Sequence, residues 1–325
     1  MKKKLNKILI LVVSILLIET VVYAWFTSNK IVTIESLDAQ ITTTGGIEIS
    51  VDGINWKANV TSRELLEHKN YRSAINQIPD TIYPVSTAGN ITNGRLDMYY
   101  GIIEPNDDDG SVMLTAIKET DKDGEDGRYI AFDVFLRATQ ATVMALNPDT
   151  IITSTRKSGS TPSGIENAIR IAIIDKGTVA DGVDVATIQS LNKTESLTII
   201  EPNYDSHTAT GVNQASNIYG ITGLTVGNNN REVPYYGIKN NIEQKIELDS
   251  KDSRYLQQVN NIIYIPKSFF SGNNHKEIFY LKQGITKLRI YAWIEGQDVD
   301  CESGASGSDI QLSLQFIATG NSKQN

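Results

Sequence analysis

Hydrophobic residues recur at every second position along much of this chain, which predicts β-strands. Residues 129–137, 288–295 and 310–316 show the pattern most clearly. Because successive side chains of a strand point to opposite faces, a period of two indicates half-buried strands in a sheet or sandwich. We expect one shared core to be lined by Ile130, Phe132, Val134, Leu136, Ile290, Ile294, Leu312, Leu314 and Phe316. Leu288, Ala292 and Ile310 fall on the same faces of these strands.

Weaker signals complete a mainly β pattern with few short helices. Further strands are predicted at 31–43, 46–51, 98–104, 112–118, 168–174, 197–200, 242–248 and 262–265. Thr61 and Glu64 have the spacing of a capping box, which predicts a helix over residues 61–76. A second short helix is predicted over residues 252–260. Polar stretches rich in Gly, Asn, Asp, Ser and Thr separate these elements and predict surface loops.

The first 24 residues have the layout of an export signal. Four lysines within the first seven residues precede an apolar run from Ile8 to Val22, and Ala24 completes a small-residue pattern that a signal peptidase recognises. We expect cleavage between Ala24 and Trp25, which leaves residues 25–325 as one large secreted or cell-surface domain. The alternative is an uncleaved membrane anchor, because about 20 apolar residues span a bilayer. Glu19 interrupts the apolar run near its end.

The net charge excludes some classes of binding partner, and the cysteine count excludes an intramolecular disulfide. Removing residues 1–24, with their four lysines and one glutamate, leaves 301 residues with 26 basic and 37 acidic side chains, a formal charge of −11. Such a chain is repelled by nucleic acid and by anionic lipid. We therefore expect no nucleic-acid partner, membrane contact only through residues 1–24 before cleavage, and a signal peptidase as the partner during export. Cys301 is the single cysteine, so no intramolecular disulfide can form. We expect a semi-buried thiol in a loop, with a disulfide between two chains as the alternative.

The sequence contains no recognisable catalytic motif. His68, His207 and His275 are far apart and none belongs to an HExxH pair. The chain also lacks a GxSxG elbow, a P-loop and a dinucleotide fingerprint. Asp300 and Glu302 flank Cys301 and oppose formation of its thiolate. These observations indicate that the protein is not an enzyme, and a metal-dependent hydrolase built from distant histidines is the less favoured alternative.

One acidic stretch, residues 295–302, is a candidate metal site. It follows a predicted strand, and Gly296 allows a sharp bend. Carboxylate oxygens are the ligands that Ca²⁺ prefers, so calcium is the one cofactor considered, although a polar loop without a cofactor is the simpler interpretation. The carboxylates concerned are Glu295, Asp298, Asp300 and Glu302. The acidic clusters at 106–110 and 121–127 are interpreted as solvated turns.

Four short blocks resemble the TasA/camelysin-type class of exported bacterial proteins. Residues 23–27 read YAWFT and resemble the junction that a dedicated signal peptidase of the SipW type cleaves in this class. Residues 290–301 read IYAWIEGQDVDC and resemble the (V/I)WIEGxDxxC segment of large clostridial members. Residues 83–87, YPVST, and 129–133, YIAFD, resemble two further recurring blocks. Together the blocks bracket nearly the whole mature chain.

This resemblance implies a jelly-roll-like antiparallel β-sandwich that is secreted. In the best-known members it also implies assembly into biofilm-matrix fibres, in which an N-terminal strand of one subunit completes the sheet of the next. The implied partners are copies of the protein itself or related matrix proteins. This chain is larger than the small members, with long loops inserted near 139–164 and 201–232. Camelysin-type members are described as metalloproteases, but no residues here match that activity.

Two functions of different classes follow. The first is a structural subunit in which residues 25–34 act as an assembly strand, with Val32 and Ile34 on the more apolar face and Ile31 on the other. An ordinary edge strand of the protein's own domain is the alternative for this segment. The second function is a monomeric surface adhesin or binding module, with Trp56 or the pair Tyr235–Tyr236 as contact residues. Core or loop packing is the simpler explanation of these aromatic residues.

Overall fold

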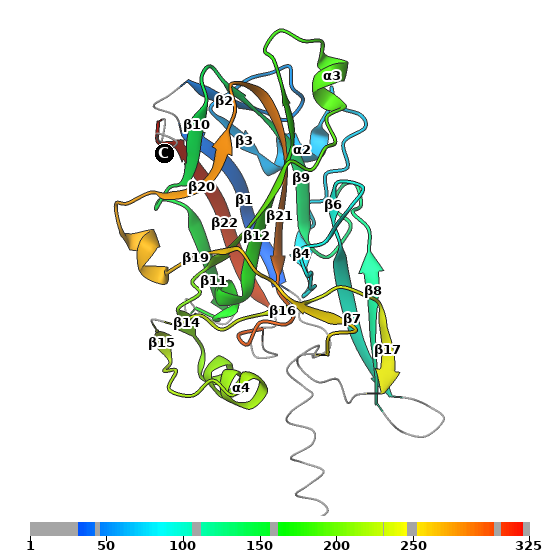
Figure 1. The fold of residues 1–325 in the computed structure, drawn as a ribbon, viewed down its shortest axis with the longest axis vertical. Coiled ribbons are helices and arrows are strands. Elements are labelled where there is room, and N and C mark those ends of the chain that lie inside the picture. Colours follow the sequence, from blue (N-terminus) through cyan, green and yellow to red (C-terminus); the bar gives the residue numbers. More distant parts are fainter. Residues whose placement is uncertain are drawn as a thin grey trace, which may run out of the picture.

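Two β-sheets pack face to face in the computed structural model, which describes residues 32–42, 46–105, 112–156, 162–229, 231–245, 252–301 and 307–320 (Figure 1). The first, sheet A, has the order β20-β10-β22-β1-β3, with β11 also paired to β22 and β4 to β1. Its strands are β1 (Val32–Thr42), β3 (Asn59–Thr61), β4 (Thr81–Ile82), β10 (Thr142–Leu146), β11 (Ile151–Arg156), β20 (Lys276–Leu281) and β22 (Ser308–Ala318).

The second, sheet B, has the order β19-β13-β12-β21-β9-β2. Its strands are β2 (Ile47–Ser50), β9 (Ile130–Ala138), β12 (Ile169–Val179), β13 (Ser196–Pro202), β19 (Ile262–Ile265) and β21 (Gly284–Ile294). The mainly β prediction is confirmed, and the two sheets form a sandwich. The jelly-roll connectivity stays a prediction.

The main core lies between the two sheets, as the alternation of hydrophobic residues predicts. All nine residues predicted to line the core belong to one buried cluster, together with Leu288, Ala292 and Ile310 from the same strand faces. Phe132 on β9 and Ile294 on β21 are fully buried, and Leu314 on β22 is 1 % exposed. Burying a side chain of this size contributes about 1.5–3 kcal/mol. The inward faces of β9, β12, β21 and β22 therefore supply much of the stability of the sandwich.

The outer face of sheet B is covered too, which makes sheet B a middle layer. Every residue of β21 is buried, including those on the face opposite the main core. Tyr291 and Trp293 pack there against Val85, Leu96 and Met98. The covering layer contains β5 (Ile91–Thr92), β6 (Arg95–Leu96), β7 (Met98–Pro105), β8 (Val112–Glu119), β16 (Tyr236–Ile238), β17 (Ile242–Lys245) and β18 (Leu256–Gln258). Charged residues of sheet B that alternate with the core residues are thus enclosed.

The helices differ from the prediction. The capping box of Thr61 and Glu64 is present, but the helix that it starts, α2 (Ser62–Glu67), ends at Glu67 instead of near residue 76. Beyond it, Tyr71 and Ala74 are buried in an irregular segment that packs against Phe135. Residues 252–260 contain strand β18 where a helix was expected, because Leu256 pairs with Ile238. The other helices of the described part are α3 (Val185–Gln189), α4 (Ala209–Tyr219), and the 3₁₀ turns η1 (Ile165–Ala168) and η2 (Lys267–Ser271).

The two stretches expected as long inserted loops contain regular structure. Residues 139–164 hold β10 and β11, which both pair with β22. Residues 201–232 hold helix α4, capped by Thr208, and a small ladder of β14 (Ser206–His207) with β15 (Gly227–Asn228). The five residues of β10 are all buried, so they show no period of two, and β11 buries only alternate positions such as Ile152 and Ser154. Within the described residues, no helix is long and apolar enough to cross a membrane.

Candidate functional site

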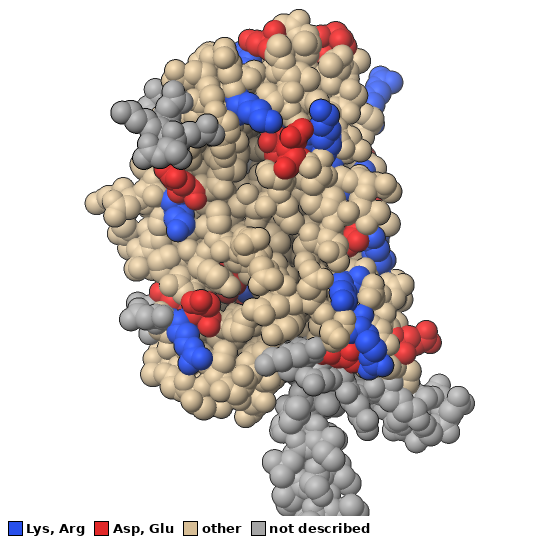
Figure 2. Space-filling model, in the orientation of Figure 1, with Lys and Arg blue, Asp and Glu red and all other residues tan. Residues whose placement is uncertain are grey.

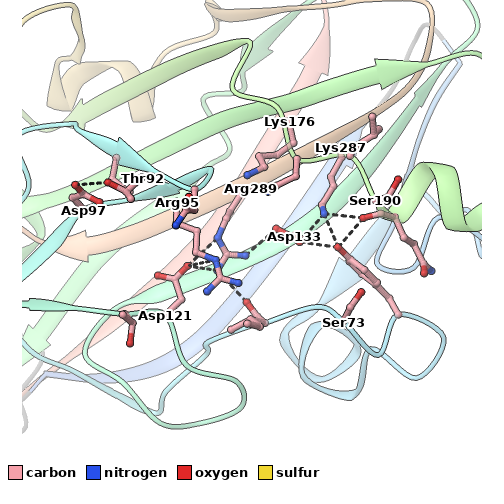
Figure 3. Close-up of a pocket in the computed structure, with 18 of the residues that line it drawn as sticks. Ser73, Thr92, Arg95, Asp97, Asp121, Asp133, Lys176, Ser190, Lys287 and Arg289 are labelled. Atoms are coloured by element: carbon pink, nitrogen blue, oxygen red, sulfur yellow. Dashed lines mark hydrogen bonds and ion pairs between the residues drawn. The ribbon is translucent and has the colours of Figure 1, made fainter.

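A polar pocket of about 530 Å³ opens on the outer face of sheet B (Figure 3). Its floor comes from three adjacent strands of the middle layer, which supply Asp133, Lys176, Lys287 and Arg289. Its walls come from the β5–β6 hairpin, strand β8 and the segments around residues 71–75 and 189–192. The pocket exists because the covering layer does not close completely over the charged positions of sheet B.

Arg289 forms the centre of the floor. Its Nη1 donates to Asp133 Oδ1 at 2.8 Å, and its Nη2 donates to Asp121 Oδ2 at 2.6 Å. Burial alone would lower the pKa of this guanidinium, but Tyr291, Asp133 and Asp121 hold that pKa well above its ordinary value. Arg289 is therefore a permanent cation, and it occupies one oxygen of each of two buried carboxylates.

Lys287 shares the second oxygen of Asp133. The Nζ–Oδ2 distance is 3.3 Å, and Nζ also donates to Tyr71 Oη at 2.5 Å and to the carbonyl of Gln189 at 3.1 Å. Burial acts to raise the pKa of Asp133, but Arg289 and Lys287 outweigh it and lower that pKa. The carboxylate of Asp133 is consequently ionised and fully engaged by protein donors.

Lys176 differs from its neighbours because it lacks an acidic partner. The side chain lies on β12, is 2 % exposed and donates from Nζ to the carbonyl of Gly94. Among the described residues, no carboxylate lies within ion-pair distance of this amine. Burial lowers its pKa to about 8; Asp133 opposes this effect, whereas Lys287, Arg289 and Arg95 reinforce it. Lys176 is thus a buried ammonium in a positive local potential.

The hairpin above Lys176 is built on an Asn-Gly turn. Asn93 and Gly94 both have positive φ, 52° and 73°, as a two-residue type I′ turn requires. A Cβ atom on Gly94 would lie 2.1 Å from Lys176 Nζ. Glycine thus serves both the turn and the close approach of the amine. Asn-Gly between two extended residues is a strong hairpin signal, and it is the sequence feature that could have located this wall.

The rim adds two more cations. Arg95 Nε lies 3.6 Å from Asp121 Oδ2, and Lys118 Nζ lies 2.7 Å from Asp97 Oδ1. The lining as a whole has five basic side chains and four acidic ones. The exposed face in Figure 2 carries Lys and Arg interspersed with Asp and Glu, without a large area of one sign. The pocket thus has one more basic than acidic side chain in its lining.

The acidic stretch predicted as a calcium site is buried and bonded to protein groups. Glu295 accepts from Trp293 Nε1 at 3.0 Å and from the main-chain N–H of Gln297 at 3.1 Å. Asp298 binds Arg170 Nη2 at 2.5 Å. Glu295 and Asp298 are 0 % and 8 % exposed. The polar loop of the simpler interpretation is thus a buried one, whose carboxylates are bonded to protein donors.

The other two carboxylates of that stretch differ in what can be described. Asp300 Oδ2 lies 2.8 Å from His207 Nδ1, and Asp300 Oδ1 accepts from Thr208 N at 2.7 Å. Glu302 lies outside the described residues. Within the described part of the chain, no group of three or more His, Cys, Asp or Glu side chains is placed to hold a metal ion. The calcium assignment stays a prediction without structural support. Cys301, expected to be semi-buried, is 1 % exposed and belongs to the main core.

Three of the sequence blocks that suggested a family lie together in the fold. Val85 donates to the carbonyl of Ile294 at 3.0 Å and accepts from Gly296 N at 2.9 Å. Ala131 pairs with Tyr291 in the β9–β21 ladder. The segments 83–87, 129–133 and 290–301 therefore form one structural unit at the end of β21.

The aromatic residues considered as surface contacts are mostly covered. Tyr235 is 2 % exposed and donates to the carbonyl of Thr87 at 3.2 Å, so the simpler explanation, packing, is confirmed for it and the contact role is not. Tyr236 is half-buried and stacks on Tyr219 with ring centroids 6.1 Å apart. Trp56 is half-buried, with the guanidinium of Arg137 4.6 Å from its ring centroid.

The described part of the predicted assembly strand, residues 32–34, lies inside sheet A. Ala24, Trp25 and Ile31 are outside the described residues, whereas Val32 and Ile34 begin β1 and pair with Ser308 and Ile310 of β22. Val32 also pairs with Ile82 of β4 on the other side. This part of the segment is thus an interior strand and not the edge strand considered as the alternative. Its pairing with β22 is parallel, whereas the other ladders of sheet A are antiparallel.

Comparisons of the chain with protein-family models, curated proteins and solved structures gave no match.

Proposed function

We propose that this protein is a secreted structural subunit that assembles with copies of itself by exchanging strand β1. The observation that carries the proposal is the position of β1: it lies within sheet A, between β22 on one side and β3 and β4 on the other. Its register with β22 runs from Val32–Ser308 to Thr42–Ile317, with one irregularity between Ile34 and Ser36. Strand β1 thus pairs with β22 along nearly its whole length and separates β22 from β3 and β4.

The connectivity makes such a strand exchangeable. Parallel neighbours cannot be joined by a tight hairpin, so β1 is held to β22 only by lateral contacts. If β1 left the slot, β22 would present a row of unpaired N–H and C=O groups. The same strand from a second copy would make the same main-chain hydrogen bonds in the same register. Because this contact is head-to-tail and need not close into a ring, repeated exchange produces filaments.

Cleavage of the expected export signal would determine when strand exchange can begin. Before cleavage between Ala24 and Trp25, residues 1–24 would tether the segment that leads into β1 to the membrane. Cleavage frees that segment outside the cell, so assembly would begin only after export. Residues 23–27 resemble the export junction of a class whose best-known members form fibres, and this resemblance supports the proposal.

A cysteine trap across the β1–β22 ladder tests this proposal. Gln40 and Gln315 are opposite each other in the register. In a Cys301→Ala background of the mature chain, copies carrying Gln40→Cys are mixed with copies carrying Gln315→Cys and oxidised. We expect disulfide-linked pairs of the two variants, and filaments in electron micrographs of the unmodified mature protein.

The matched control for this trap is the off-register mixture of Gln40→Cys with Gln311→Cys, because Gln311 is opposite Ser36. We expect little cross-linking in that mixture. The proposal fails if the Gln40→Cys/Gln315→Cys double variant closes its own disulfide efficiently while the mixed single variants stay unlinked. It also fails if the mature protein remains monomeric at high concentration.

A further inference from the structure

The buried amine of Lys176 faces a pocket and has no acidic partner. Its side chain is 2 % exposed, and the carbonyl of Gly94 is its one hydrogen-bond acceptor among the described residues. An ammonium group has three N–H donors, and burial without a counter-charge is costly. A ligand with a negatively charged acceptor would supply both a further hydrogen-bond acceptor and a counter-charge for this amine.

The other charges of the pocket leave this position positive. Asp133 and Asp121 are engaged by Arg289 at 2.8 Å and 2.6 Å, and Lys287 takes the second oxygen of Asp133. Arg95 reaches Asp121 only through Nε at 3.6 Å. Its two terminal nitrogens have no protein acceptor among the described residues, so they can bind a planar anionic group in the bidentate manner typical of guanidinium.

The shape and lining of the pocket define the rest of the ligand. A volume of about 530 Å³ lies within the range of small-molecule sites, about 300–1,000 Å³. Tyr71 is the one aromatic side chain of the lining, whereas hydroxyl and amide groups are numerous, as at Thr92, Asn93, Ser190 and Asn192. Such walls match a hydroxylated molecule better than an apolar one.

We propose that this pocket binds a small hydrophilic anion, a hydroxylated molecule whose carboxylate or phosphate group is held by Lys176 and Arg95. Strand β12 of sheet B positions Lys176 in the floor, and the β5–β6 hairpin positions Arg95 at the rim. The chain as a whole has a formal charge of −8, which repels anions at long range. Binding therefore depends on this local arrangement and not on general attraction. The site is independent of strand exchange and goes beyond the structural role.

Titration calorimetry on the mature protein tests the site with three sugars of similar size. Glucuronate supplies a carboxylate, glucose 6-phosphate supplies a phosphate, and glucose is the neutral counterpart. We expect at least one of the two anions to bind at least about tenfold more tightly than glucose, as expected for a charge-assisted interaction with buried cations. The anion that binds more tightly identifies the acidic group that the pocket accepts.

Variants assign the binding to the pocket. Lys176→Met keeps the length of the side chain and removes its charge, and Arg95→Gln removes the guanidinium from the rim. We expect each variant to weaken the bound anion by about tenfold or more. The matched control is Lys276→Met on β20 of sheet A, a lysine exposed to solvent, which should leave the affinity unchanged.

Loss of binding must be distinguished from loss of folding in these variants. Thermal unfolding of each variant shows whether it is folded, and Arg95→Gln at the partly exposed rim serves if Lys176→Met does not fold. The proposal is overturned if neither anion binds at millimolar concentration, if glucose binds as tightly as both anions, or if both pocket variants bind like the parent protein.

Discussion

The amine of Lys176 donates a hydrogen bond to the main-chain carbonyl of Gly94 and so connects β12, in the middle layer, to the β5–β6 hairpin above it. The contact joins residues far apart in the sequence and holds the pocket wall over its floor. It also leaves a positive charge inside the protein without a carboxylate beside it. Both consequences can be measured.

Lys176→Met should stabilise the protein at pH 7. The pKa of Lys176 is lowered from 10.5 to about 8 in the folded state, chiefly by burial. Below pH 8 the amine is charged in both folded and unfolded states, and folding must bury that charge. As the pH rises from 8 towards 10.5, the folded protein releases the proton first, so the stability of the parent protein increases. Urea unfolding at pH 7, 8, 9 and 10 should show the advantage of Lys176→Met shrinking. An advantage that stays constant over this range would contradict the assignment.

Gly94→Ala should destabilise the protein more than Gly182→Ala does. Both glycines have positive φ, 73° and 88°, so alanine strains both turns, at a cost of roughly 1 kcal/mol. Only at Gly94 would the new methyl group also meet a neighbour, since a Cβ there lies 2.1 Å from Lys176 Nζ and nothing lies within 4 Å at Gly182. Urea unfolding of both variants measures the difference. Equal losses would show that the amine moves aside freely.

Glu295→Gln should make the protein less sensitive to rising pH. Burial raises the pKa of Glu295 from 4.5 to about 7, although Ser86, Trp293 and Gln297 donate to it. The folded protein thus keeps a proton that the unfolded chain releases, and stability falls as the pH rises from 4.5 through 7. Glutamine resembles the protonated acid, so its unfolding free energy should equal the parent value below pH 4.5, where the acid is protonated in both states. It should exceed the parent value by roughly 1–3 kcal/mol at pH 8. A fixed difference across this interval would exclude a raised pKa.

Leu314→Asp should abolish cooperative folding, whereas Gln315→Asp should be tolerated. Leu314 is 1 % exposed in the main core, so aspartate there would bury a charge without a partner. Gln315 is the next residue of β22, points to the opposite face and is partly exposed. Thermal unfolding followed by near-ultraviolet circular dichroism distinguishes the two variants. Similar losses at both positions would contradict the placement of β22.

The inner face of sheet B could be predicted from the sequence, but its outer face could not. Alternation correctly placed Ile290 and Ile294 in the core and Arg289 and Trp293 on the other side. A period of two does not say whether the second face meets water or another layer. The covering layer contains residues from several distant segments, so its position depends on tertiary contacts that no local pattern contains.

The pocket escaped prediction for the same physical reason. Lys176, Arg95 and Arg289 come from three elements, and each alone is an ordinary charged residue of a strand. The Asn93–Gly94 turn was the one local signal of this region. The carboxylates of residues 295–300 could be recognised as a cluster because they are close in the sequence. Their partners could not, because Arg170 and His207, which bind Asp298 and Asp300, lie far away in the sequence.

The pairing of β1 with β22 also determines when sheet A can form during folding. Val32 is opposite Ser308, so the central ladder of sheet A joins segments that are 276 residues apart in the chain. Contacts of such long range form slowly, because a very large loop must close before they contribute. A chain that emerges from a membrane channel N-terminus first cannot complete this sheet until β22 has followed. If the chain is exported as proposed, this topology delays closure of sheet A until β22, close to the C-terminal end of the described residues, has crossed the membrane.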